Sequence, residues 1–82
     1  MRMAQSSDPP IGTVLRELRV QRRFSQEQLA AKAKMHRNYI GGLERGEKSP
    51  TFKSVGRILA VLGVSWSELG AALDRNPQLS HQ

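Results

Sequence analysis

The amino-acid sequence predicts an all-α fold of five short helices, and three observations support this prediction. In five separate segments, apolar residues recur at the spacing of a helix with about 3.6 residues per turn. Serine, threonine, glycine and proline stand between these segments, where they favour helix starts and stops. No segment alternates strictly between apolar and polar residues, as a half-buried strand does. A length of 82 residues predicts one domain with a modest core, which a partner or a second copy would help to stabilise.

The first two helices begin at recognisable signals. Pro9-Pro10 can precede a helix but cannot lie inside one, so the first helix should begin near Ile11 and run to about Arg23. Ser25, followed three residues later by Gln28, is a capping-box pattern that predicts a second helix over roughly 26–33. The core face of the first helix consists of Ile11, Val14, Leu15 and Leu18.

The last three helices follow the same logic. The third should cover about 37–45 and stop at Gly46, and the fourth should lie between a Ser49-Pro50-Thr51 loop and Gly63. The apolar stripe of the fourth helix consists of Phe52, Val55, Ile58, Leu59 and Leu62. A second capping box, formed by Ser65 and Glu68, predicts a fifth helix over about 66–73. The chain then divides into a flexible segment at 1–10, a helical domain at 11–73 and a frayed tail at 74–82.

Charge and composition limit the classes of function. The chain has 13 Lys and Arg against seven Asp and Glu, and 11 of the basic residues lie between Arg16 and Arg57. Such a basic excess attracts a phosphate backbone, although surface lysines and arginines that only maintain solubility would give the same count. With no cysteine and two histidines, the sequence predicts no disulfide, zinc site or other metal site, and no cofactor. No apolar run reaches the length of a signal peptide or a membrane span, so we expect a cytoplasmic protein without a membrane partner.

Residues 25–46 predict two short helices joined by a tight turn. Helical periodicity of about 100° per residue places Leu29, Ala30 and Ala33 on one face of the first and Ile40 and Leu43 on one face of the second. Ala30 is small where two helix backbones must approach closely. This pattern is typical of a helix-turn-helix, in which the second helix packs across the first.

Four stretches of the chain are similar to the phage-repressor/Cro-like, or Xre-type, family of helix-turn-helix regulators. They are LRELRVQRRFSQEQLA, YIGGLERG, SPTFKSVGRILAVLGVS and WSEL. The resemblance covers roughly residues 11–73, and this ordered set of motifs is far more specific than helix-turn-helix spacing alone. It implies a five-helix, lambda-repressor-like domain that binds double-stranded DNA as a dimer, with the third helix in the major groove.

The third helix carries the candidate base-reading residues. If Ile40 is the centre of the buried face, Asn38, Gly42 and Arg45 point the opposite way, and Arg37 and Gly41 flank them. The resemblance implies base contacts at Arg37, Asn38 and Gly42. Arginine can bind guanine and asparagine can bind adenine through two hydrogen bonds each, although Arg37 touching only phosphate is the alternative. The base-reading set is therefore Arg37, Asn38, Gly41 and Gly42.

The two glycines and two other positions depart from what a rigid recognition helix needs. Gly41 and Gly42 cost about 1 kcal/mol each relative to alanine, and they either let the helix lie deep in the groove, read little, or bend the helix. Lys34 stands at a helix end that favours glycine, and His36 is a poor N-cap. Candidate DNA-backbone contacts, each with a solvated-surface alternative, are Ser25, Gln26, His36, Tyr39, Arg45, Lys48, Ser49, Thr51 and Lys53.

One ion pair and one dimer interface are also predicted. Glu44 lies about 40° from Ile40 on the packed side of the third helix, so it needs a partner. Arg19 is the expected partner, as the resemblance also implies, and Arg22 is the alternative. For a homodimer, the candidate interface residues are Val64, Trp66 and Leu73, and the alternative is that they only close the monomer core.

Three functions fit these observations. The leading one is a sequence-specific transcriptional regulator that binds a partly palindromic operator as a homodimer, as phage repressors and restriction-modification controller proteins do. The second is a DNA-binding antitoxin with a toxin as its protein partner. The third is an adaptor or small enzyme, but the sequence shows no nucleophile with a base, no carboxylate pair and no phosphate-binding loop. We therefore expect no catalytic residue and no enzyme activity.

Overall fold

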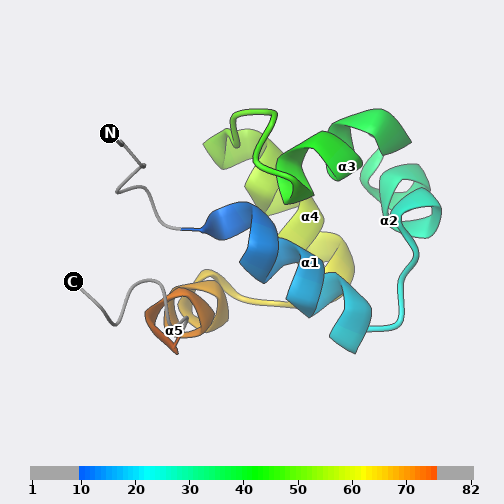
Figure 1. The fold of residues 1–82 in the computed structure, drawn as a ribbon. Helices are drawn as coiled ribbons and strands as arrows, with labels where there is room; N and C mark the ends of the chain where they lie inside the picture. Colours follow the sequence, from blue (N-terminus) through cyan, green and yellow to red (C-terminus); the bar gives the residue numbers. More distant parts are fainter. Residues whose placement is uncertain (1–9, 76–82) are drawn as a thin grey trace, which may run out of the picture.

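A computed structural model describes residues 10–75, which form five α-helices and no strand, so the predicted all-α fold is confirmed (Figure 1). Of the predicted flexible segment at 1–10 and frayed tail at 74–82, residues 1–9 and 76–82 lie outside the described residues. The part predicted as a frayed tail begins too early, because Asp74 and Arg75 are helical. The helices are α1 (Ile11–Gln21), α2 (Gln26–Ala33), α3 (Arg37–Glu44), α4 (Phe52–Leu62) and α5 (Trp66–Arg75).

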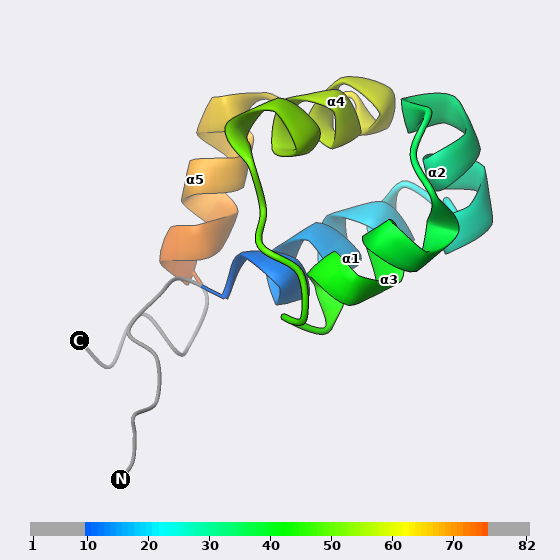
Figure 2. The same cartoon turned by 90° about the horizontal axis from the view of Figure 1, so that it is seen from above.

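The helices surround one apolar core. Helix α3 packs against α1 and α2, α2 also packs against α4, and α5 packs against α1. In Figure 2, α1 and α3 run side by side, α4 lies across the core from them, and α2 and α5 close the two ends. The most completely buried large side chains are Val14, Leu29, Ile40, Ile58 and Leu59. Each helix except α5 contributes at least one of them, so the orientation of α3 depends on the whole core.

Side-chain caps fix where α2, α4 and α5 begin. The Ser25 hydroxyl accepts from the Gln28 N–H at 3.0 Å, and the Gln28 side chain accepts from the Ser25 N–H at 2.8 Å, as predicted. Ser65 and Glu68 exchange the same pair of bonds at the start of α5. At α4 the reciprocal partner of Thr51 is Ser54, which the sequence analysis did not identify.

Two helix ends differ from what their residue types favour. Arg23 has φ 64 and Lys34 has φ 59, so both lie in the left-handed region that favours glycine. Helix α1 ends at Gln21, before the predicted end at about Arg23, and Arg23 lies in the link to α2. Lys34 ends α2 in the left-handed conformation, for which the sequence analysis noted that glycine is favoured. The α2–α3 turn therefore stores backbone strain that neighbouring groups must offset.

Close backbone approach between α1 and α3 requires one glycine. A Cβ atom on Gly12 would lie 2.1 Å from the Leu43 carbonyl oxygen. Backbone atoms cannot yield as a flexible side chain can, so only glycine fits there. This contact brings the end of α3 against the start of α1.

Among the described residues, no single helix is long and apolar enough to cross a membrane. Helices α4 and α5 pass that test of length and composition only when taken together, and they bend by 98° at their junction.

Candidate nucleic-acid interface

Helix α3 has one face in the core and one turn exposed. Ile40 and Leu43 are 1% and 2% exposed, whereas Arg37 and Asn38 in the first turn are exposed. Arg37 Nε lies 3.9 Å from Glu27 Oε2, which is a long distance for an ion pair, and both side chains are more than half exposed. Such a pair contributes little, so it does not hold Arg37 away from another ligand.

Gly41 and Gly42, which the sequence analysis placed in the base-reading set, are both buried. A Cβ atom on Gly42 would lie 2.5 Å from Cγ of Lys48. One on Gly41 would lie 3.0 Å from Nη1 of Arg45 and 3.6 Å from Oε1 of Gln26. The missing side chains leave room that three longer side chains fill. The outward surface of α3 beyond its first turn is therefore made by Gln26, Arg45 and Lys48.

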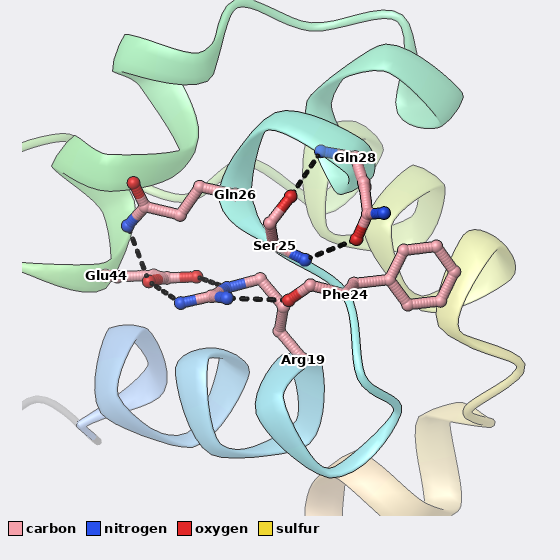
Figure 3. A network of polar contacts seen from close by, with 6 residues as sticks. All are labelled: Arg19, Phe24, Ser25, Gln26, Gln28 and Glu44. Atoms are coloured by element: carbon pink, nitrogen blue, oxygen red, sulfur yellow. Dashed lines mark hydrogen bonds and ion pairs between the residues drawn. The ribbon is translucent and has the colours of Figure 1, made fainter.

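A buried polar network fixes the end of α3, and Figure 3 shows its members. Arg19 Nε and Nη2 donate to the two carboxylate oxygens of Glu44 at 2.7 and 3.0 Å. The side chains are only 10% and 3% exposed. Arg19 Nη1 also donates to the Phe24 carbonyl at 2.7 Å, which ties the network to the link before α2. The ion pair is present at the predicted positions, and it joins α1 to α3.

Gln26 belongs to the same network. Its Nε2 donates to Glu44 Oε1 at 3.0 Å, so the first residue of α2 is bound to the last residue of α3 (Figure 3). This bond orients the Gln26 amide at the helix start, where unpaired backbone N–H groups favour an anion. The alternative partner for Glu44, Arg22, instead donates to the Leu62 carbonyl at 3.2 Å and to Glu68 at 3.4 Å.

The other candidate backbone contacts fall into two groups. The hydroxyls of Ser25 and Thr51 cap their own helices, so their first role is local. The Tyr39 hydroxyl lies 3.1 Å from the Ser54 hydroxyl and 3.3 Å from the Ser49 carbonyl oxygen, which ties α3 to the start of α4. His36 is the N-cap of α3 and makes no side-chain capping bond, as expected of a poor cap. Apart from Tyr39, which is half-buried, all of these candidates are exposed: Ser25, His36, Arg45, Lys48, Ser49, Thr51 and Lys53.

An exposed ion pair follows α3. Arg45 Nη2 lies 3.0 Å from Glu47 Oε1. This hydrogen bond and the positive charge of Arg45 lower the pKa of the Glu47 carboxyl, and the hydrogen bond and the negative charge of Glu47 raise the pKa of Arg45. Arg45 thus keeps its charge next to the reading face, but part of that charge is neutralised by Glu47.

The candidate dimer residues lie in different environments. Val64 is 6% exposed and belongs to the monomer core, because the α4–α5 link folds inward, so its assignment to an interface is corrected. Trp66 is 46% exposed and stacks on Phe52 with ring centroids 4.7 Å apart. Phe52 was expected in the core stripe, but it is 80% exposed in the first turn of α4. Leu73 is half-buried against the core.

Sequence reasoning also missed Arg57. Its Nη2 donates to the carbonyl oxygens of Ala33 and Lys34 at the end of α2. Its position on α4 gave no signal, because the contact joins residues more than 20 positions apart. Within the part of the chain that the structure describes, no three His, Asp or Glu side chains gather as a metal site would require.

Comparisons with known proteins agree with this geometry. The helix-turn-helix family model matches residues 15–69. The chain is 31% identical over 67 residues to the uncharacterised HTH-type transcriptional regulator y4dJ of Sinorhizobium fredii, covering 82% of this chain and 87% of that protein. It is 34% identical over 59 residues to the control protein C.BamHI of Bacillus amyloliquefaciens, covering 71% and 73%.

A solved structure is similar over most of the chain. The restriction-modification controller protein C.Esp1396I, as a tetramer in complex with its natural 35 base-pair operator, matches with a TM-score of 0.78. The identity is 29%, and the match covers 88% of this chain and 92% of that one.

Proposed function

Because the chain belongs to the phage-repressor-like, or Xre-type, helix-turn-helix family, we propose that it regulates transcription by binding double-stranded DNA with α3 in the major groove. The family consists of transcriptional regulators rather than enzymes. One observation carries the proposal: Arg37 and Asn38 are exposed in the first turn of a helix whose opposite face is locked into the core. A regulator of this kind acts in the cytoplasm.

Base reading rests on Arg37 and Asn38. A guanidinium can donate two hydrogen bonds to O6 and N7 of guanine, and a carboxamide can exchange two with N6 and N7 of adenine. Each such contact discriminates against the wrong base by about 1–3 kcal/mol. Gly41 and Gly42 supply no side chain, so base contacts made by α3 itself depend on Arg37 and Asn38. The side chains of Gln26, Arg45 and Lys48, which cover the two glycines, add further contacts with the DNA.

Phosphate binding rests on the surrounding groups. Lys53 is exposed in the first turn of α4, and Gln26 stands at the start of α2. Helix N-termini carry partial positive charge, so both positions favour phosphate oxygens on either side of the reading helix. The net charge of +6 strengthens this attraction.

The protein acts as a homodimer on a partly palindromic operator. A two-fold pair places its recognition helices about 34 Å apart on one face of the duplex. The exposed Phe52–Trp66 stack, together with Leu73, offers apolar and aromatic surface on α4 and α5 for this contact. Trp66 and Leu73 therefore stay as interface residues, Phe52 joins them, and Val64 does not.

The comparisons favour one class of regulated gene. C.BamHI is a control protein, and C.Esp1396I is a restriction-modification controller protein. We therefore place a restriction-modification operon first among the possible targets of this regulator. A toxin gene beside the coding sequence would instead support the antitoxin hypothesis. The genes on either side therefore decide between a restriction-modification controller and an antitoxin.

Selection of bound sequences from random duplexes tests the proposal. The wild-type protein should enrich a partly palindromic sequence, and the N38A variant should lose preference at one position per half-site with about 1–3 kcal/mol weaker binding. The K53A variant should bind all duplexes more weakly and reduce the salt slope by about one unit, without changing preference. A wild-type protein that enriches no sequence at low salt would contradict the proposed function.

A further inference from the structure

Arg57 reaches from α4 to the corner between α2 and α3. Its Nη2 donates to the carbonyl oxygens of Ala33 at 2.5 Å and Lys34 at 2.7 Å. The last carbonyls of a helix have no partner within the helix and carry partial negative charge. A guanidinium is well suited to this position because it keeps its charge and donates in a fixed plane.

The corner that Arg57 holds is a strained one. Met35 N–H donates to the Ala30 carbonyl at 2.9 Å, and Lys34 N–H lies 3.4 Å from the Ala31 carbonyl, as in a Schellman ending. These bonds leave the carbonyls of Ala33 and Lys34, which are the two that Arg57 binds. Lys34 has φ 59, where a side chain is disfavoured. Arg57 therefore stabilises a backbone conformation that the local sequence does not favour.

The same corner sets the start of the recognition helix. Only Met35 and His36 separate Lys34 from Arg37, and His36 makes no side-chain capping bond to hold that start. A change in the carbonyl directions at Lys34 would therefore pass within two residues to Arg37 and Asn38. The far end of α3 is held separately, by Arg19 and Gln26 through Glu44.

We propose that Arg57 is a positioning residue for DNA reading, which fixes the α2–α3 corner and thereby the angle at which Arg37 and Asn38 meet the base edges. This inference rests on the proposed function. Arg57 contacts no base in this role, and its Nη2 is directed at protein carbonyls rather than at a phosphate.

The test compares R57A with two matched variants. Binding is measured by titration against the selected duplex and against an unrelated duplex, at several salt concentrations and well below the melting temperature. R57A should lower the affinity for the selected duplex about tenfold, within the range for one lost base contact, while the affinity for the unrelated duplex changes little. R16A removes the same charge from the exposed face of α1 and should leave the ratio of affinities unchanged. K53A should weaken both duplexes together.

A merely structural role is separated by a second substitution. In the R57A/K34G double variant, glycine relieves the left-handed strain and should restore thermal stability. The ratio of the affinities for the selected and the unrelated duplex should stay low, because the double variant still lacks the Arg57 contact with the α2–α3 corner. Recovery of the full ratio in the double variant, or an equal loss on both duplexes with a salt slope about one unit smaller, would overturn the inference.

Hydrogen exchange gives a readout that needs no DNA. Exchange at the Met35 amide should be faster in R57A than in R16A, because this amide closes the corner. If the wild-type protein prefers no duplex but this difference in exchange is seen, the proposed function is wrong, although Arg57 does stabilise the α2–α3 corner. Equal exchange rates in R57A and R16A would refute the claim that Arg57 stabilises the α2–α3 corner.

Discussion

Replacing Glu44 with alanine should remove most of the stability of this domain. Glu44 accepts three hydrogen bonds, from Arg19 Nε at 2.7 Å, Arg19 Nη2 at 3.0 Å and Gln26 Nε2 at 3.0 Å. Its side chain is 3% exposed, so water cannot replace the carboxylate after the substitution. Arg19 would keep only the Phe24 carbonyl as a partner. Removing one member of a buried pair costs about 3–5 kcal/mol, because the other charge is left buried and unpaired.

The size of this loss is large for a domain of this length. Stability of about 0.05–0.15 kcal/mol per residue gives about 3–10 kcal/mol for residues 10–75. A shift of about 4–8 °C per kcal/mol predicts a melting temperature lower by at least about 12 °C. Urea denaturation followed by circular dichroism measures the change in the free energy of unfolding directly.

A double-mutant cycle separates the pair from its desolvation. E44L and R19M should each be strongly destabilised, whereas R19M/E44L should recover most of the loss, since a well-packed apolar pair can replace a buried ion pair. An E44A variant within about 0.5 kcal/mol of the wild type would refute this reasoning, because only exposed residues behave that way. The recovered double variant should still read DNA less well, since Gln26 has lost the carboxylate that orients it.

Three further predictions follow from the backbone and from the exposed ion pair. G12A should be destabilised by about 1–3 kcal/mol or more because its Cβ meets an α3 carbonyl, whereas G70A has open space and should gain about 1 kcal/mol; urea midpoints compare the two. K34G should raise the free energy of unfolding by about 1 kcal/mol because φ is positive there, and an unchanged or lower value would contradict this. In R45A, an NMR titration should show the pKa of Glu47 rising toward 4.5, since the lowered pKa comes from Arg45. In the wild type, the Arg45–Glu47 pair therefore stabilises the fold above pH 4.5, and this contribution is lost as the pH falls through the lowered pKa of Glu47.

The helix positions were predictable because their signals are local. Ser25 and Ser65 bind backbone groups within three residues, so the sequence alone indicates where α2 and α5 begin. The partner of Glu44 was also predictable, because its place beside Ile40 on the helix forces the carboxylate toward the core. Periodicity and the need to pair a buried charge were sufficient there.

The errors concern contacts that depend on how the helices are arranged. Phe52 belongs to the apolar stripe of α4 by spacing, but the first turn of that helix lies where neighbouring helices do not cover it. Gly42 points away from the core as predicted, yet Lys48 folds over it from the following loop. Arg57 spans from α4 to α2, and no local pattern encodes which carbonyl a long side chain reaches. In each case the length of a flexible side chain, or the edge of a packed element, decides the outcome.

The recognition helix is held mainly from outside itself. It has eight residues, two of which are glycine, and a helix this short is not stable alone in water. Its start is fixed by the α2–α3 corner, its middle by Tyr39 and the core, and its end by Glu44. These bonds come from all of the first four helices. Changes in DNA preference should therefore arise from substitutions that never touch DNA, at Arg19 or Arg57 as readily as at Asn38, because the angle of α3 is a property of the packed domain.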